Sequence, residues 1–311
     1  MSQPEYIYTF SFTAEEHPLC QLEMRAFFGC DTSLHSLKSN KEVDPSRSPF
    51  MNERIEVMFQ EGTVDDMINS VTSIPRSDET FKLTFVQNSD EKKVPFKQAK
   101  NIERIVGMEI GDNADLVNPD RNYGIIFSDG EWCFGPMVKG ESVWTRHQDK
   151  PHQYSTALST RIARSIVNIA VPQIENVTVI DPCCGIGTVL LEAKSMGITI
   201  GGSDINPKVM YGSRKNLAHF GYESNVELKD IREISKHYDV AIIDMPYNLC
   251  SVLEPEDQFE MLVSARNFAS KVVVVTIEPI DEAVIQAGFE IADRCVFKKN
   301  GRFKREVLVC K

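Results

Sequence analysis

Strand and helix patterns alternate through the second half of the chain, and this alternation limits the possible folds more than any other feature. Val240–Ile243 is a continuous apolar run, which is typical of a parallel strand covered on both faces. The pattern ends in Phe289–Lys299 and Phe303–Cys310, two strand-like runs on either side of Asn300–Gly301. Asn-Gly between two such runs is a strong hairpin signal. The second half therefore predicts a doubly wound α/β sheet with an antiparallel strand at its end.

The other elements of this half are placed from residue types and turn signals. The strands ahead of the hairpin are expected at Val177–Asp181, Ile198–Ile205, Val226–Asp230, Tyr238–Asp244 and Val272–Ile277. The helices are expected at Thr156–Ala170, Thr188–Met196, Pro207–Phe220, Pro255–Ala269 and Asp281–Ala287. Residues 145–155 are polar and look like a linker, which sets a domain boundary near residue 150.

The first half is less regular and predicts a mixed α+β module. Its strands are expected at Tyr6–Phe12, Ile55–Phe59, Lys82–Val86, Asp115–Val117 and Tyr123–Phe127. Its helices are expected at Leu19–Phe28, Val64–Val71 and Ala99–Val106. Residues 34–52 are mostly polar, so we expect a loop there.

The cysteines and the N-terminal sequence bear on the cellular compartment. The chain has 311 residues and 8 cysteines, without a Cys-x-x-Cys pair. Free thiols without zinc-type spacing are typical of a reducing compartment. No basic and apolar leader opens the sequence, and no run approaches the roughly 18 apolar residues of a membrane span. We therefore expect a cytoplasmic protein without a bound metal.

Charge is unevenly distributed along the chain, whose formal net charge is −11. Residues 169–293 carry 9 basic and 19 acidic residues, whereas residues 294–311 carry 7 basic residues and 1 acidic residue. The basic C-terminal end could face a polyanion while the acidic parts face away from it. Solvated surface charges would explain the same pattern, so charge alone leaves RNA binding open.

The motif DPCCGIGT, Asp181–Thr188, follows an expected strand and opens an expected helix. Its glycines let backbone N–H groups approach a ligand at the positive end of the helix. A dinucleotide fingerprint would need a small residue where this chain has Leu190. An aspartate at the end of the first strand would repel a pyrophosphate and suits a cationic ligand. S-adenosylmethionine carries a sulfonium and an ammonium group, so the motif favours this cofactor.

Two further carboxylates stand at the ends of the next expected strands. Asp204 can accept hydrogen bonds from both hydroxyls of a ribose. Asp230 can accept from the exocyclic amine of an adenine. Each could instead cap the helix or turn that follows it. Because the carboxyl ends of parallel strands line one crevice, the recurrence of Asp181, Asp204 and Asp230 favours a cofactor site.

The motif DMPYNL, Asp244–Leu249, ends the fourth expected strand beside that crevice. A planar exocyclic amine is a poor nucleophile because it shares its lone pair with the ring. The Asp244 carboxylate and the Met245 carbonyl can accept its two N–H bonds and direct the lone pair toward a methyl donor. Pro246 would stiffen the turn, and Tyr247 would stack on the base. A buried strand followed by an ordinary turn is the simpler alternative.

Together, DPCCGIGT, GGSDINP and DMPYNL resemble the motifs of the THUMP-domain class I RNA guanine-N2 methyltransferases, especially the family that modifies guanosine at position ten of tRNA. KPHQYSTALSTRIARSIVNIA resembles that family's segment before the first motif, and ADLVNPDRNYGIIFSDGEWCFG resembles the end of a THUMP domain. The resemblance covers about residues 113–311. It implies methyl transfer from S-adenosylmethionine to an exocyclic amine in RNA, above all guanosine N2 in tRNA.

The resemblance also implies a domain division and a set of functional residues. Residues 1–50 would form a ferredoxin-like part, residues 51–150 a THUMP-like RNA-binding domain, and residues 151–311 a Rossmann-like methyltransferase domain with a terminal β-hairpin. The implied cofactor contacts are Asp181, Cys183, Gly185, Gly187, Asp204, Asp230 and Ile231. The implied catalytic residues are Asp244, Pro246 and Tyr247. The implied substrate contacts are Met245, Tyr154, Ser155, Lys298 and Lys299.

Other activities remain open at the level of sequence. A DNA or rRNA amino-methyltransferase would share the chemistry of Asp244, although the THUMP-like segment argues against DNA. A protein-glutamine methyltransferase usually has Asn in place of Asp244. A catalytically inert RNA-binding protein could keep the fold, but the intact motif residues argue against it. The linker histidines, His147 and His152, are expected at the surface.

Overall fold

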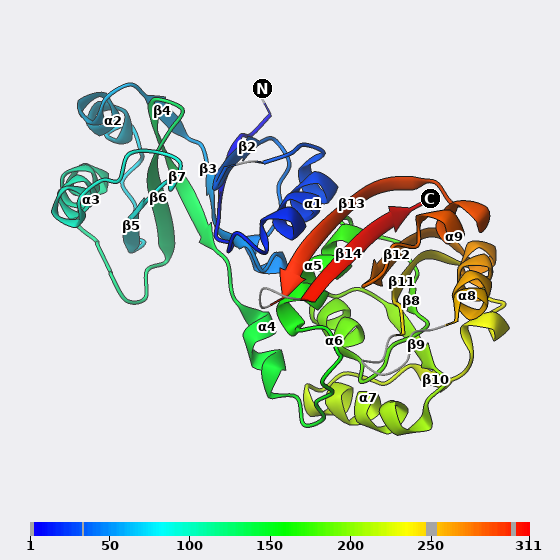
Figure 1. Cartoon of the computed structure of the whole chain (residues 1–311). Coiled ribbons are helices and arrows are strands. Elements are labelled where there is room, and N and C mark those ends of the chain that lie inside the picture. Colours follow the sequence, from blue (N-terminus) through cyan, green and yellow to red (C-terminus); the bar gives the residue numbers. More distant parts are fainter. Residues whose placement is uncertain (1–2, 33, 247–253, 300–302) are drawn as a thin grey trace. The chain divides into compact units, whose positions relative to one another are not determined.

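In the computed structural model, which describes residues 3–32, 34–246, 254–299 and 303–311, the chain builds two separate sheets. Each sheet belongs to its own unit (Figure 1). The first unit comprises Met1–Ser11, Thr32–Ser46 and Phe50–Glu141. The second unit comprises Phe12–Asp31, Arg47–Pro49 and Ser142–Lys311. The main junction, at Glu141 and Ser142, lies close to the boundary expected near residue 150.

The first unit is a mixed α+β structure, as the patterning predicts. Its strands are β1 (Tyr6–Phe10), β2 (Ser36–Ser39), β3 (Met51–Glu56), β4 (Phe59–Glu61), β5 (Phe81–Val86), β6 (Arg121–Ser128) and β7 (Glu131–Lys139). Its helices are α2 (Val64–Val71) and α3 (Phe96–Ile110). The sheet order is β2-β1-β3-β7-β6-β5, with β4 also paired to β7. A boundary at residue 50 would cut through this sheet, because β1 and β2 pair on one side of β3.

Two expectations for this unit are wrong. Asp115–Val117 is not a strand, because the Asp115 carboxylate accepts the backbone N–H groups of Val117 and Asn118, at 2.8 and 3.0 Å, and turns the chain. Residues 34–52 are not one loop, since they contain β2 and the start of β3. The polar composition of β2, which lies at the edge of the sheet, gives it no clear strand pattern.

The second unit contains the doubly wound sheet, which confirms the α/β prediction. Its strands are β8 (Val179–Asp181), β9 (Ile200–Asp204), β10 (Val226–Leu228), β11 (Tyr238–Asp244), β12 (Ala269–Thr276), β13 (Ile291–Lys299) and β14 (Phe303–Cys310). They lie in the order β10-β9-β8-β11-β12-β14-β13. Pairing is parallel from β10 to β12 and antiparallel for β14 and β13. The apolar residues of β11 and β12 are buried on both faces of the sheet.

The helices of this unit are α1 (His17–Phe28), α4 (Val143–Arg146), α5 (Thr160–Ala170), α6 (Thr188–Ser195), α7 (Pro207–His219), α8 (Pro255–Phe268) and α9 (Asp281–Gln286). Helix α5 begins four residues later than Thr156, the expected start, because the Ser159 side chain accepts the Ile162 N–H and caps the helix there. Helix α7 has Pro207 in its first turn and the Asn206 side chain as its cap. The expected linker forms α4 and a short 3₁₀ turn, His147–Asp149.

Two short segments from the first part of the sequence belong to the second unit. Arg25 of α1 forms two hydrogen bonds with the Asp293 carboxylate of β13, each 2.8 Å long. Glu23 of α1 is fully buried, and its carboxylate accepts the Asn168 amide at 2.5 Å. Arg47 donates to the carbonyls of Val171 and Pro172 at 2.8 and 2.7 Å, past the end of α5. These contacts make α1 and residues 47–49 part of the second unit.

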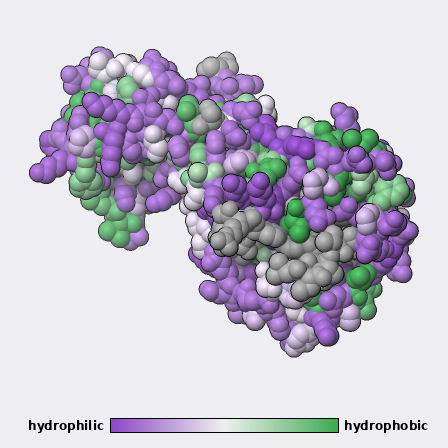
Figure 2. Space-filling view, in the orientation of Figure 1, coloured by the Kyte–Doolittle hydropathy of each residue, from purple (hydrophilic) through white to green (hydrophobic). Residues whose placement is uncertain are grey.

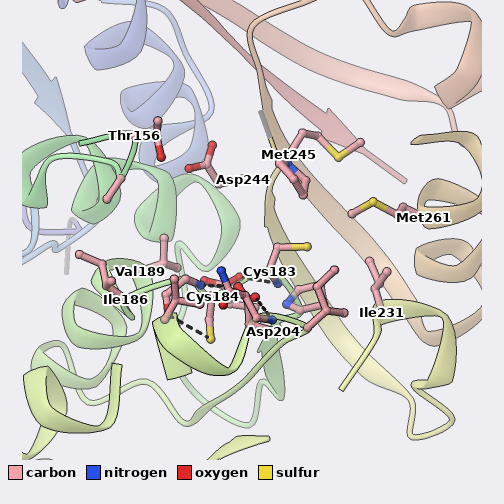
Figure 3. A pocket seen from close by; sticks show the side chains of 18 of the residues that line it. Thr156, Cys183, Cys184, Ile186, Val189, Asp204, Ile231, Asp244, Met245 and Met261 are labelled. Atoms are coloured by element: carbon pink, nitrogen blue, oxygen red, sulfur yellow. Dashed lines mark hydrogen bonds between the residues drawn. The ribbon is translucent and has the colours of Figure 1, made fainter. Parts of the chain in front are cut away.

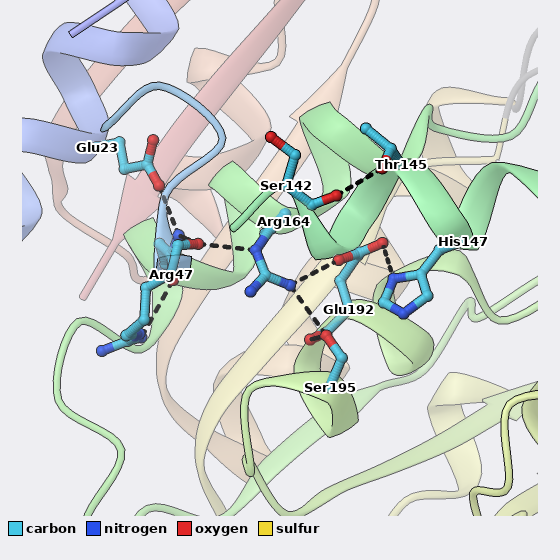
Figure 4. Close-up of polar contacts among 9 residues, drawn as sticks. Glu23, Arg47, Ser142, Thr145, His147, Arg164, Glu192 and Ser195 are labelled. Carbon is cyan, nitrogen blue, oxygen red and sulfur yellow. Dashed lines mark hydrogen bonds and ion pairs between the residues drawn. The ribbon is translucent and has the colours of Figure 1, made fainter. Parts of the chain in front are cut away.

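A buried polar network continues from these contacts to α6 (Figure 4). Arg164 of α5 donates to the Arg47 carbonyl at 2.9 Å and pairs with the Glu192 carboxylate of α6 at 3.0 Å. His147 pairs with the other oxygen of Glu192 and is only 3% exposed. The expectation of a surface His147 is therefore wrong, because its ring closes this network.

The visible surface of both units is mostly hydrophilic, with apolar residues in small separate groups (Figure 2). Within the described ranges, no helix is long and apolar enough to cross a membrane.

Candidate active site

A cavity of about 580 Å³ opens at the carboxyl ends of the parallel strands in the second unit (Figure 3). Asp181 ends β8, Asp204 ends β9, Asp244 ends β11, and Asp230 follows β10 by two residues. All four aspartates line the cavity. Its volume suits a cofactor or a small ligand. The acidic lining suits a ligand that carries positive charge.

The loop between β8 and α6 forms the floor of this cavity. Asp181 is 3% exposed, and its Oδ1 accepts the Cys183 N–H at 3.1 Å. Burial raises the pKa of Asp181 well above its usual value. Gly185 and Gly187 have φ angles of 50° and 79°, in the left-handed region that favours glycine. A Cβ on Gly187 would also lie 2.5 Å from the Ser213 hydroxyl oxygen of α7.

Asp204 ties the second strand to that loop. Its Oδ2 accepts the Gly185 N–H at 2.9 Å, and its Oδ1 accepts the Asn206 N–H at 2.8 Å. The side chain of Asn206, and not that of Asp204, caps α7. The alternative reading of Asp204 as the helix cap is therefore excluded. Each carboxylate oxygen keeps a further lone pair with which it can accept from a ligand hydroxyl.

Asp230 combines its predicted capping role with an ion pair. Its carboxylate accepts the Arg232 N–H at 2.8 Å and caps a 3₁₀ turn, Ile231–Glu233. It also receives two hydrogen bonds from the Arg232 guanidinium, at 3.0 and 2.8 Å. These hydrogen bonds hold the pKa of Asp230 below its usual value. The neighbouring apolar residues Ile231 and Met261 line the same end of the cavity and could contact the face of a flat ring.

Among the four aspartates of the cavity, Asp244 has a buried carboxylate oxygen that receives no hydrogen bond from the described residues. Its Oδ1 atom is buried and has no hydrogen-bond partner among the residues that the structure describes. Burial raises the pKa of Asp244 to about 7, and the positive charge of Arg305 opposes that rise. Buried polar atoms are normally satisfied, so an orphaned oxygen in a cavity points to a ligand that donates to it. Met245 and Pro246 continue the cavity wall from Asp244.

The structure brings most of the predicted site residues together. Those that line the cavity are Tyr154, Asp181, Cys183, Gly185, Asp204, Asp230, Ile231, Asp244, Met245 and Pro246. Gly187 and Ser155 do not line it. Lys298 lies exposed on β13, while Tyr247 and the side chain of Lys299 lie outside the described residues. No group of three or more metal-binding side chains occurs in the described part of the chain.

Sequence reasoning missed several cavity residues. Thr156, Ile205, Arg232 and Met261 also line it. Ile205 directly follows Asp204, and Arg232 directly follows Ile231, which are both predicted contact positions. Their positions near strand ends could therefore have predicted them as cavity residues. Met261 lies on α8, and nothing in its helical pattern separates a cavity residue from a core residue. In Figure 3, Thr156 and Asp244 lie at one end of the cavity and Ile231 and Met261 at the other.

Residues 147–256 match the family described as RMKL-like, methyltransferase domain. A tRNA (guanine(10)-N2)-dimethyltransferase of Methanothermobacter thermautotrophicus is 29% identical over 178 residues, which cover 52% of this chain and 53% of that protein. The human U6 snRNA (guanine-N(2))-methyltransferase THUMPD2 is 29% identical over 160 residues, which cover 48% of this chain and 31% of that protein. The chain thus spans about half, or less, of the length of these relatives.

A solved structure shares the whole fold. SMU.472, described as a methyltransferase and crystallised with SAH, superimposes with a TM-score of 0.50 at 12% identity, over 99% of this chain and 98% of that chain. At this identity the likeness concerns the fold alone, and it agrees with a class I methyltransferase architecture for the second unit.

Proposed function

We propose that this chain, whose residues 147–256 match the RMKL-like methyltransferase domain family, transfers a methyl group from S-adenosylmethionine to the N2 amine of a guanosine in RNA. Two relatives carry names that specify guanine N2 as the methylated atom, one in tRNA and one in U6 snRNA. Guanine N2 is common to both names, whereas the RNA differs between them. Guanine N2 as the methylated atom therefore has broader support than tRNA as the substrate.

The cavity residues fit S-adenosylmethionine. Asp204 would accept hydrogen bonds from the ribose hydroxyls, and Ile231 would contact the adenine ring. Asp181 and the Gly185 region lie where the methionine end, with its positive charge, would be stabilised by the acidic lining. When bound, this cofactor supplies an electrophilic methyl group on its sulfonium.

The observation that carries the proposal is the orphaned Oδ1 of Asp244. A buried carboxylate oxygen that no described residue contacts by a hydrogen bond, at the strand end of the methyltransferase domain, can accept one N–H of a planar amine. The Met245 carbonyl, next along the cavity wall, can accept the other. The two acceptors would orient the nitrogen lone pair and lower its delocalisation into the ring. After the transfer, the cationic nitrogen loses a proton readily, to Asp244 or to water.

The finer assignments belong to the same proposal. We take the RNA to be tRNA and the compartment to be the cytoplasm, and we take the first unit, whose single sheet has strands from both sides of residue 50, to be the THUMP-like RNA-binding part. Tyr154 lines the cavity beside Thr156, which supports a contact with the target base. The described cysteines are all free, in keeping with a reducing compartment.

A single-turnover assay with labelled S-adenosylmethionine and unmodified tRNA tests the proposal. The wild-type protein should produce N2-methylguanosine, and Asp244→Ala should lower the rate by orders of magnitude. Asp244→Asn should be milder, because the amide oxygen still accepts one hydrogen bond. Asp239→Ala, at the amino end of the same strand, is the matched control and should leave the rate near that of the wild type.

Other outcomes would redirect the assignment. Label on adenine, on DNA or on protein would contradict guanine N2 as the acceptor. A full rate in Asp244→Ala would remove Asp244 from the chemistry. Cofactor binding without label transfer to any nucleic acid would favour the inert RNA-binding alternative.

A further inference from the structure

Arg305 is the largest of the fully buried side chains in the described part of the chain. It lies on β14 and is 1% exposed, although its neighbour Lys304 is exposed. Arginine is almost never fully buried unless its charge is compensated. The proposed methyl transfer does not involve the Arg305 side chain. The burial of this charge within the sheet therefore needs a physical explanation.

The strand register places Arg305 on the same face of the sheet as Asp244. Asp244 of β11 pairs with Val275 of β12, and Val275 pairs with Val307 of β14. Side chains in register share a face, and residues two apart on one strand also share it. Arg305 therefore projects from the Asp244 face, one step beyond the carboxyl ends of β11 and β12.

A hydrogen bond links Arg305 to the cavity wall. Its guanidinium donates to the Thr156 carbonyl at 3.1 Å. Thr156, Ala157 and Leu158 line the cavity in the segment that leads into α5. This segment has little regular structure of its own, so the bond to Arg305 fixes the backbone that faces Asp244.

The charges around Asp244 are unequal in sign. From β14 comes the positive charge of Arg305, which lowers the pKa of Asp244. Asp181, which ends β8, and Cys183, in the loop that follows, face Asp244. The charge of Asp244 contributes to raising the pKa of each of them. Among the described residues, Arg305 is thus the cation whose charge opposes the effect of burial on the Asp244 carboxylate.

We propose that Arg305 is a positioning residue of this active site: it supplies the positive charge that keeps the Asp244 carboxylate ionised, and it holds the Thr156 segment against that carboxylate. The inference rests on the proposed function, since it explains how a buried aspartate can accept the substrate amine at neutral pH. Only the ionised form offers both oxygens as acceptors. Arg305 acts through Asp244 and Thr156 and need not touch the substrate.

The pH dependence of single-turnover methylation tests this role. The wild-type rate should rise with pH through a midpoint near the pKa of Asp244, which is about 7. In Arg305→Gln the midpoint should move to higher pH, and the rate at pH 7 should fall by about fivefold for the first pH unit of movement and by about tenfold for each further unit. Raising the pH should restore part of that loss. Affinity for adenosylhomocysteine, measured by calorimetry, should stay close to the wild-type value.

Two further variants separate charge from packing. Arg305→Lys keeps the positive charge and should keep a midpoint close to that of the wild type, with a lower plateau because the bond to Thr156 is weakened. Arg294→Gln removes an exposed arginine from the same hairpin and should leave the pH profile unchanged. If Arg305→Gln does not fold, Arg305→Lys carries the test, and a midpoint displaced to high pH in this charged variant would overturn the proposal.

A measurement without RNA distinguishes this inference from the function it rests on. Carbon-13 NMR of aspartate-labelled protein, with Asp244→Asn used for assignment, reports the titration of Asp244 directly. The proposal predicts a higher Asp244 pKa in Arg305→Gln than in the wild type, and equal values would overturn it. If the wild-type protein methylates no RNA but this pKa still moves, the proposed function fails and the role of Arg305 stands.

Discussion

The Nδ1 atom of His147 lies 2.7 Å from Oε1 of Glu192, and both side chains are almost wholly removed from solvent. The other oxygen of this carboxylate pairs with Arg164 at 3.0 Å. Glu192 is therefore the joint between α6, α5 and the 3₁₀ turn that holds His147. Replacing it by alanine would leave a buried arginine without its ion pair.

Glu192→Ala should accordingly lower the free energy of unfolding of the catalytic unit by about 3–5 kcal/mol, the usual cost of breaking a buried pair by removing one partner. Urea unfolding followed by circular dichroism would measure this loss. The matched control is Glu227→Ala, which breaks an exposed pair with Lys229 and should cost less than about 1 kcal/mol. Equal losses in both variants would show that the network adds no special stability.

Glu23 gives a prediction about pH. Burial raises the pKa of Glu23 to about 7 in the folded protein, from a usual value of 4.5. Between these values the folded state binds more protons than the unfolded state, so this residue makes stability fall as pH rises from about 4.5 and through 7. In Glu23→Gln that penalty is absent, while the amide can still accept from Asn168 and donate to the Ser48 hydroxyl.

Glu23→Gln should therefore match the wild type near pH 5 and exceed its stability at pH 8, by up to about 3 kcal/mol. Urea unfolding of both proteins at the two pH values gives the comparison. Taking the difference removes every other titrating group from the result. If Glu23→Gln is less stable than the wild type at pH 8, the surrounding residues stabilise the ionised Glu23 carboxylate in the folded protein, and the prediction is wrong.

Much of the catalytic unit could be predicted because its signals are local. The apolar run of β11 and the Asn300–Gly301 sequence between two strand-like runs each predict their element without reference to the rest of the chain. The attachment of α1 could not be predicted in this way. An amphipathic helix shows that one face is buried, but Leu19 and Leu22 do not specify the surface that covers them.

Asp204 allows a test of the cofactor site. Its carboxylate is expected to bind the ribose hydroxyls, and it already holds the Gly185 N–H. Asp204→Ala should weaken the binding of adenosylhomocysteine by about 1.5–3 kcal/mol, the value of hydrogen bonds to a charged group. Isothermal titration calorimetry would measure it. Asp230→Ala should weaken binding less, because its oxygens are already engaged by Arg232. Tight binding of NAD in place of adenosylhomocysteine would contradict the cofactor assignment.

The basic hairpin leads to a prediction about RNA. Lys298 and Lys299 lie at the end of β13, and Lys298 is exposed. If they contact phosphates, replacing both by alanine should weaken tRNA binding and reduce its dependence on salt concentration, since fewer counterions are released. Filter binding over a range of salt concentrations would show it. Lys229 and Lys236, in the segment between β10 and β11, are the control pair. An unchanged salt slope would place the hairpin outside the interface.

The part of the candidate site that lies at the ends of strands could be predicted from the sequence. Asp181, Asp204 and Asp244 each end a parallel strand, so their convergence followed from the parallel sheet. Arg305 was not predicted as a site residue because it is one of the 7 basic residues in the basic C-terminal end, residues 294–311. The alternation of Arg305 with the buried Val307 and Val309 would have shown that it faces inward. Residues such as Met261 come to the cavity through helix packing, which no local pattern specifies.

The discontinuous make-up of the catalytic unit has a consequence for its synthesis. Helix α1 leaves the ribosome early, with its apolar face and Glu23 uncovered, while its partner α5 is still untranslated. Every strand of the first unit's sheet except β1 lies between them in the sequence. Contacts between such distant segments form late and slowly. A gene fragment that starts near residue 150 would encode every motif of the active site and yet omit part of the structure on which these motifs rest.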